Sequence, residues 1–172
     1  MVDNLEVAQF IYLLLHNGTI REVIDTITSK AVLILGRFTP KRKVVLNAIR
    51  KELRRRNYLA IVFDFEKPAA RNFTEMISTV AHMARFIIAD ITDAKSIPQE
   101  WQRIVPDLPS VPVQPILQAS AKGYGMFPDF KSYPWVLETY RYKSLKGIIT
   151  ALTEKVITPA ERKAKEPIKS PP

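Results

Sequence analysis

The sequence predicts an α/β fold of three layers, in which helices cover both faces of a five-stranded parallel sheet. Short, continuously apolar segments alternate with amphipathic helical segments along most of the chain. Strands of a parallel sheet are buried on both faces, so they are apolar throughout and do not alternate with polar residues. The 172 residues, 47% of them hydrophobic, suffice for one domain with a buried core.

We expect residues 1–30 to form a helical hairpin ahead of this domain. Apolar residues recur at helical spacing over residues 5–15, and the triplet "HNG" that follows is typical of a helix end and a turn. Thr19 then stands in an N-cap position with Glu22 three residues later, which is the spacing of a capping box. Isoleucines and a valine give this second helix an apolar face.

The α/β domain is expected over residues 31–158. Its fourth strand contains two prolines, which favour an edge or irregular strand. Residues 159–172 are charged and rich in proline, and we expect them to form a disordered tail. The predicted strands cover residues 31–35, 59–65, 85–91, 111–117 and 135–140. The predicted helices cover residues 41–56, 73–83, 100–105 and 145–157.

The positive charge is concentrated in the predicted helix over residues 41–56. This segment holds eight basic residues against the single acid Glu52, which accounts for +7 of the net charge of +9. Cations at the end of a helix complement its dipole, and no recognition motif accompanies them, so we do not expect a nucleic-acid partner. The same face could meet an acidic partner or a membrane surface. The inward side of this helix is assigned to Val44, Val45, Ala48, Ile49 and Leu53.

Several classes of function are excluded or disfavoured by composition. The chain has no cysteine, so it carries no disulfide, thiolate nucleophile or cysteine zinc site. Its two histidines, His16 and His82, are far apart in the sequence, and we expect no metal and no cofactor. The apolar run over residues 10–15 is too short to span a membrane and lacks the flanks of a signal peptide. These features favour a cytoplasmic protein.

Polar segments follow the first three predicted strands, at the sheet edge where α/β proteins bind ligands. In the first, Gly36 permits close approach of the backbone. Thr39 and Pro40 then suit the N-cap and first position of a helix, whose N-terminus with Arg37, Lys41 and Arg42 nearby suits a phosphate. The alternative is a capped helix with a solvated surface.

The second and third segments carry carboxylates. Asp64 opens a loop of mixed charge, which either closes over a ligand or partner or is a solvent-exposed loop with weak ion pairs. Asp90, Asp93 and Glu100 follow the third strand. They either cap helices and complement a helix dipole or form a site.

The segments "FDFEKP" and "IADITDAKSIPQEW", with the strand and helix order around them, resemble a Toll/interleukin-1 receptor (TIR) domain of bacterial type. The resemblance covers residues 31–152 and extends to nucleoside deoxyribosyltransferase-like proteins of the flavodoxin-like fold. In enzymatic TIR domains a serine precedes the catalytic glutamate by four residues. Ser96 and Glu100 match that spacing.

This resemblance implies cleavage of an N-glycosidic bond in NAD or a related nucleotide, with NAD as substrate. Glu100 would stabilise or attack the oxocarbenium-like ribose, and Ser96 would orient Glu100 or the ribose. Asp90 would bind a hydroxyl or base edge, and Arg37 would take phosphate. The resemblance equally allows a non-catalytic module that signals by self-association or by binding a protein partner.

Overall fold

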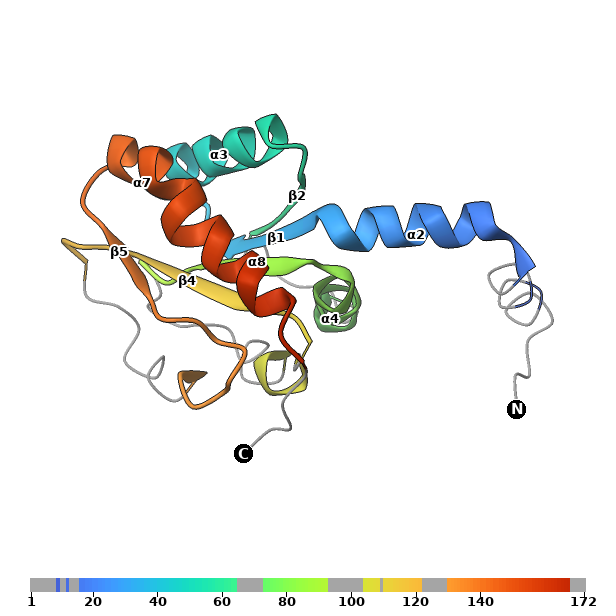
Figure 1. Cartoon of the computed structure of the whole chain (residues 1–172). Helices are drawn as coiled ribbons and strands as arrows, with labels where there is room; N and C mark the ends of the chain where they lie inside the picture. The colour runs from blue at the N-terminus through green and yellow to red at the C-terminus, as the bar shows by residue number, and fades with distance from the viewer. Residues whose placement is uncertain are drawn as a thin grey trace.

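The computed structural model describes residues 9, 12, 16–64, 73–92, 104–108, 110–121 and 130–167. Its centre is a parallel sheet with the strand order β2-β1-β3-β4-β5 (Figure 1), which confirms the predicted fold class. The order reverses between β1 and β3, so a crevice between their carboxyl ends is the expected ligand position. The strands are β1 (Ala31–Gly36), β2 (Leu59–Asp64), β3 (Phe86–Asp90), β4 (Val113–Gln118) and β5 (Tyr140–Tyr142).

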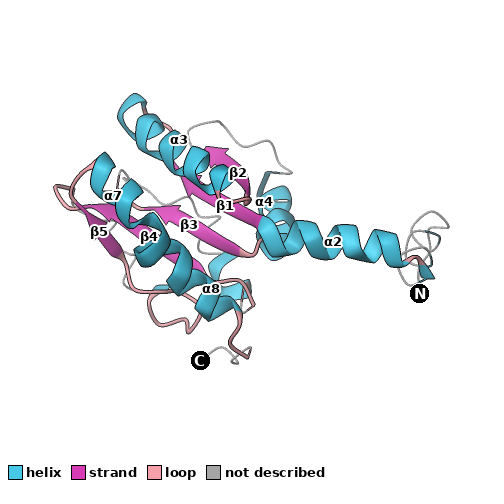
Figure 2. Cartoon of the chain, turned by 45° about the horizontal axis from the view of Figure 1, so that its top comes forward, coloured by secondary structure: helices cyan, strands magenta, loops and turns pink. Residues whose placement is uncertain are grey.

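Helices cover both faces of the sheet, as predicted. On one face α3 (Pro40–Arg55) lies beside α7 (Leu145–Leu152), and α4 (Phe73–Met83) lies on the other (Figure 2). Successive side chains of a strand point to opposite faces. Leu33 and Leu35 of β1 accordingly belong to the cluster on the α4 side, while Val32 and Ile34 belong to the cluster under α3.

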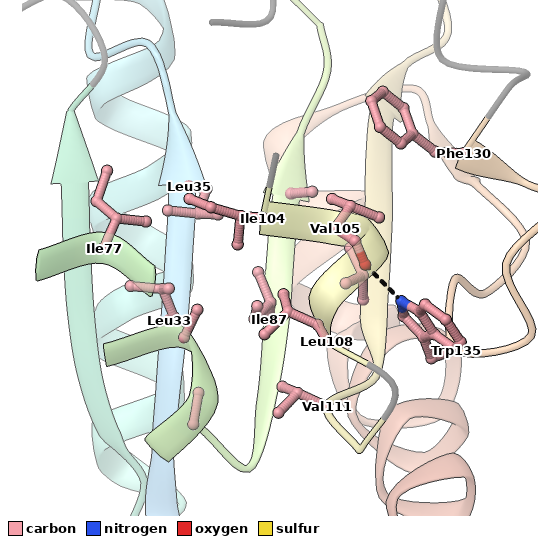
Figure 3. Packing of buried hydrophobic residues seen from close by; sticks show 14 of the residues in the cluster. Leu33, Leu35, Ile77, Ile87, Ile104, Val105, Leu108, Val111, Phe130 and Trp135 are labelled. Carbon is pink, nitrogen blue, oxygen red and sulfur yellow. Dashed lines mark hydrogen bonds between the residues drawn. The ribbon is translucent and has the colours of Figure 1, made fainter. Parts of the chain in front are cut away.

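The cluster on the α4 side is completed by irregular segments (Figure 3). The short 3₁₀ helix η1 (Val105–Asp107) brings Val105 against the sheet, and the indole Nε1 of Trp135 donates to the Val105 carbonyl over 2.8 Å. A helix was predicted over residues 100–105. Residues 100–103 lie outside the described part of the chain, so only the end of that prediction can be compared with this turn. Trp135 itself precedes the fifth strand, which begins at Tyr140 and not at residue 135.

The buried face of α3 differs from the prediction at three positions. Val44 is 58% exposed, and Leu46 is buried in its place beside Val45, Ile49 and Leu53. Arg42 is also on the buried face, only 4% exposed. The predicted face was therefore rotated by part of a turn, because only apolar residues were assigned to it.

The fourth strand lies between β3 and β5, so of the two expected alternatives the edge strand was wrong, and the broken ladder toward β5 fits the irregular strand. Val113 exchanges backbone hydrogen bonds with Trp135 and Leu137, and the ladder toward β5 resumes at Ile116. Pro115, which has no amide hydrogen, falls in the gap between these pairings. The buried Gln114 fills this gap, because its amide nitrogen donates to the carbonyls of Pro115 (3.0 Å) and Glu138 (2.8 Å).

The helix α2 (Gly18–Lys30) projects from the α/β body and joins β1 without a loop (Figures 1 and 2). Its N-cap is Asn17, whose side-chain oxygen accepts from the Thr19 amide over 3.1 Å, so the predicted Thr19 cap was wrong by two residues. Most of the preceding helix of the expected hairpin lies outside the described residues, and the hairpin stays a prediction.

The closing helix extends further than predicted, and the expectation of a disordered tail over residues 159–172 was wrong for residues 159–164, which are helical. α7 continues as the π-helical segment η2 (Thr153–Ile157) and then as α8 (Thr158–Ala164). Pro159 accounts for the irregularity, because its ring crowds the carbonyl four residues earlier in a regular α-helix. Within the described residues, no helix combines the length and hydrophobicity that a membrane span requires.

Candidate functional site

The carboxyl ends of β1 and β3 meet at the point where the strand order reverses, and they bring Gly36 against Asp90. A Cβ atom added at Gly36 would lie 3.1 Å from the Cβ of Asp90 and 3.2 Å from Cδ1 of Leu46. Both distances are shorter than ordinary van der Waals contact. A glycine is needed at position 36 because its lack of a side chain lets β3 and α3 pack closely against the end of β1.

Asp90 forms a buried ion pair with Arg42. The guanidinium places Nη2 at 2.7 Å and Nε at 2.8 Å from Oδ2 of Asp90. The side chains are 5% exposed for Arg42 and 1% for Asp90. The other carboxylate oxygen, Oδ1, accepts from the backbone amide of Thr92 over 3.1 Å. Both oxygens of Asp90 are therefore engaged within the protein.

Arg42 also contacts the carboxyl ends of β4 and β5. Its Nη1 donates to Oε1 of Gln118 over 2.8 Å, and its Nη2 donates to the hydroxyl of Tyr142. The backbone amide of Gln118 donates in turn to the hydroxyl of Thr92 over 3.0 Å. We call Arg42, Asp90, Thr92, Gln118 and Tyr142 the Arg42 network. It ties the first turn of α3 to the carboxyl ends of β3, β4 and β5.

The electrostatics of the Arg42 network keep Arg42 charged and Tyr142 neutral. Burial by itself lowers the pKa of Arg42, but the charge of Asp90 and the hydrogen bond to Tyr142 raise that pKa above its ordinary value. Burial raises the pKa of Tyr142, and the charge of Asp90 adds to that rise, although Arg42 opposes it. The guanidinium of Arg42 is therefore charged and the phenol of Tyr142 is protonated at neutral pH.

The loop after β1 is held by Asp64, at the end of β2. The backbone amide of Phe38 donates to Oδ1 of Asp64 over 3.1 Å, and Arg37 beside it is half-buried. At the start of α3, Thr39 caps the Arg42 amide over 3.4 Å, and Pro40 has no amide hydrogen. Two of the first three amide positions of α3 are thus unavailable to a phosphate.

Four of the six predicted site residues lie in the described part of the chain. Gly36, Arg37, Asp64 and Asp90 gather at the carboxyl ends of β1, β2 and β3, with Gly36 in register with Asp64. Ser96 and Glu100 lie outside the described residues. The chain leads toward them directly from Thr92, which the Arg42 network holds through its amide and its hydroxyl.

Three members of the Arg42 network were missed by the sequence analysis: Thr92, Gln118 and Tyr142. Arg42 was expected near a phosphate at the start of its helix, and its role as the buried partner of Asp90 was missed. Arg42 carried a detectable signal, because it precedes Val45, Leu46 and Ile49 by three, four and seven residues and so shares their helical face. Gln118 and Tyr142 carried none, since their role depends on a side chain 76 and 100 residues away in the chain.

Elsewhere the described residues offer less chemistry. They contain no cluster of three or more histidine, aspartate or glutamate side chains that could hold a metal ion. A hollow of about 260 Å³ lies at the gap between β4 and β5, apart from the Arg42 network. It is lined by Gln114, Leu137, Glu138, Thr139, Tyr140, Lys155 and Pro159.

Comparisons with known proteins reveal similarity of fold alone. No protein-family model matches the chain, and no curated protein sequence matches it. A CMP N-glycosidase from Clostridium botulinum superimposes with a TM-score of 0.54 at 11% identity, covering 71% of this chain and 97% of that one. A diflavin flavoprotein from Nostoc sp. has a TM-score of 0.55 at 12% identity, covering 77% and 90%.

The lysine decarboxylase of Francisella novicida matches with a TM-score of 0.52 at 17% identity, over 77% of this chain but only 18% of the decarboxylase. None of these three structures is named as a TIR domain. Identities this low establish the flavodoxin-like arrangement and leave function to the site itself.

Proposed function

We propose that this chain is a TIR-like nucleotide-binding module that hydrolyses the N-glycosidic bond of NAD or a related nucleotide through Glu100. The observation that carries the proposal is the position of the Arg42 network. It lies where the strand order reverses, and it fixes Thr92 at the start of the segment that leads to Ser96 and Glu100.

The ion pair between Arg42 and Asp90 favours Glu100 over Asp90 as the carboxylate that acts on the ribose. Departure of the base with the bonding electrons leaves positive charge on the ribose, and a carboxylate stabilises that charge or attacks C1′. Water then supplies the hydroxyl group at C1′. The charge of Asp90 is balanced by Arg42, and both its oxygens are hydrogen-bonded. Asp90 therefore supports the site, and Glu100 supplies the negative charge that faces the ribose.

The substrate class is supported by the cations beside this edge and by one similarity of fold. Arg37 and Lys41 flank the start of α3, and the positive charges of these two side chains, rather than the amides of the helix N-terminus, would attract a nucleotide phosphate. The Clostridium botulinum protein, which has this arrangement of strands over almost its whole length, is named as an N-glycosidase of CMP. A nucleotide is therefore favoured over an unphosphorylated nucleoside.

The experiment compares base release by the wild-type chain and by Glu100→Gln. Purified protein at high concentration is incubated with NAD or with CMP, and nicotinamide or cytosine is quantified by chromatography. We expect release by the wild type and none by Glu100→Gln, with unchanged circular dichroism. Glu138→Gln is the matched control, because Glu138 is exposed and lies outside the Arg42 network. Absence of release with both substrates, or equal release by Glu100→Gln, contradicts the proposal.

A second candidate function, association with another protein chain, is favoured by α2. This helix projects from the body, and its apolar side is open, with Val23 52% and Ile27 38% exposed (Figure 2). An isolated helix of 13 residues is marginal in water, so a partner would stabilise it. Sedimentation equilibrium of the wild type and of Val23→Asp tests this, and a monomer at every concentration would contradict self-association.

A further inference from the structure

We propose that the outer face of α3 is a docking surface for an anionic lipid bilayer. This outer α3 face consists of Lys41, Lys43, Val44, Lys51, Arg54 and Arg55, all of them exposed. Figures 1 and 2 show α3 at the periphery of the molecule, with its outer side turned away from the sheet. The inference goes beyond the proposed function: the outer α3 face shares only Lys41 with the proposed nucleotide site, and the variants that test it leave Lys41 unchanged.

The outer α3 face has a large excess of positive charge. Glu52, the one acid of α3, pairs with Arg55 over 2.9 Å and with Arg56 over 2.5 Å, so it offsets part of the charge at the carboxyl end of the helix only. Within the described residues, Lys41, Lys43, Lys51 and Arg54 form no ion pair. The neighbouring segment over residues 139–153 adds three cations and contains no acid.

The exposed apolar side chain of Val44 favours an anionic bilayer over other negatively charged partners. Helical spacing places Val44, Lys51 and Arg55 on one line along the outside of α3, at i, i+7 and i+11, over about 16 Å. Val44 is 58% exposed, and helical spacing places Lys41 about one turn before it and Lys51 two turns after it. An apolar side chain among cations fits the boundary between headgroups and acyl chains, where lysines and arginines meet lipid phosphates.

A nucleic acid fits the same face less well. The phosphate backbone has no apolar surface to receive Val44, and α3 contains no aromatic side chain on which a base could stack. Leu145, 38% exposed at the start of the neighbouring α7, adds a second apolar side chain beside the cations. The combination of charge and exposed aliphatic side chains favours lipid.

The first experiment is co-sedimentation of the full chain with vesicles of phosphatidylcholine alone or with about one third phosphatidylserine. Each cation near an anionic membrane contributes about 1 kcal/mol, or about five-fold in partitioning. Lys51→Glu/Arg54→Glu is therefore expected to lower partitioning into the anionic vesicles by at least about thirty-fold. Lys131→Glu/Lys165→Glu makes the same change in net charge away from α3 and should retain most of the binding. High salt should release the wild type.

The second experiment separates lipid from nucleic acid. Val44→Ser removes apolar surface without changing charge, so we expect it to weaken vesicle binding about five-fold and to leave any binding to a DNA or RNA duplex unchanged. The proposal is overturned if the wild type fails to bind anionic vesicles at low salt, or if both charge-reversal variants lose binding equally. Binding to a duplex but not to vesicles assigns the surface to nucleic acid and also overturns it.

Discussion

Arg42→Met is expected to destabilise the protein strongly, because it leaves the Asp90 carboxylate buried without its counter-charge. The two side chains are 5% and 1% exposed, so water cannot replace the lost partner without local opening of the fold. Breaking a buried ion pair by removing one member costs about 3–5 kcal/mol. Loss of the donors to Gln118 and Tyr142 places the expected cost toward the upper end of that range.

Unfolding in urea, followed by circular dichroism, measures this cost as a free energy, and thermal unfolding measures it as a fall in Tm. For a chain of this length, each kcal/mol lowers Tm by about 2–4 °C, so Arg42→Met should lower Tm by roughly 6–20 °C. Arg54→Met, on the exposed side of the same helix, should change stability by less than about 0.5 kcal/mol. The double variant Arg42→Met/Asp90→Leu should recover much of the loss, since no charge is then left buried. An Arg42→Met protein within about 1 kcal/mol of the wild type would refute the reasoning.

Three further predictions concern residues around the sheet. Gly36→Ala should cost about 1–3 kcal/mol in urea unfolding because its Cβ lacks space, whereas Gly18→Ala, with no atom within 4 Å of the added Cβ, should be neutral or stabilising. Gln114→Leu should lose about 1–3 kcal/mol by leaving two backbone carbonyls without a donor, and unchanged stability would show that water replaces the amide. Burial, aided by the charge of Glu161, raises the pKa of Tyr58 to about 12. Its stabilising contribution is therefore complete below pH 10 and lost as the pH rises through 12. The stability difference between wild type and Tyr58→Phe should shrink over that interval, and a constant difference would contradict the assignment.

The sequence was sufficient for the sheet and its helices because the pattern of burial is local. Continuous apolar runs marked β1 and β3, and the helical period marked α3, whatever their neighbours were. Pro115 shows where a local rule fails. It predicted an edge or irregular strand, yet β4 is internal and only its pairing is irregular, because the chain opposite Pro115 leaves the ladder there and Gln114 occupies the gap. That accommodation depends on a segment more than 20 residues away.

The position of the candidate site in the fold could be predicted from the sequence, but the ion pair and hydrogen bonds between its side chains could not. The carboxyl-edge rule located Gly36, Asp64 and Asp90, since each ends a strand of a parallel sheet. The partner of Asp90 was hidden by the basic run around Arg42, where one of eight cations turns inward. Only the packing of α3 on the sheet determines which cation this is, and that cation decides whether Asp90 is open to a ligand.

The measurement that tests the central claim most directly is titration of the backbone amide NMR resonances with NAD and with CMP. If a nucleotide binds at the point where the strand order reverses, the largest shifts belong to Gly36, Arg37 and Thr92, while Val105 on the α4 side is unaffected. Shifts that are absent, or that concentrate around Leu137 and Tyr140 at the hollow beside β5, would contradict a nucleotide site at this edge of the sheet.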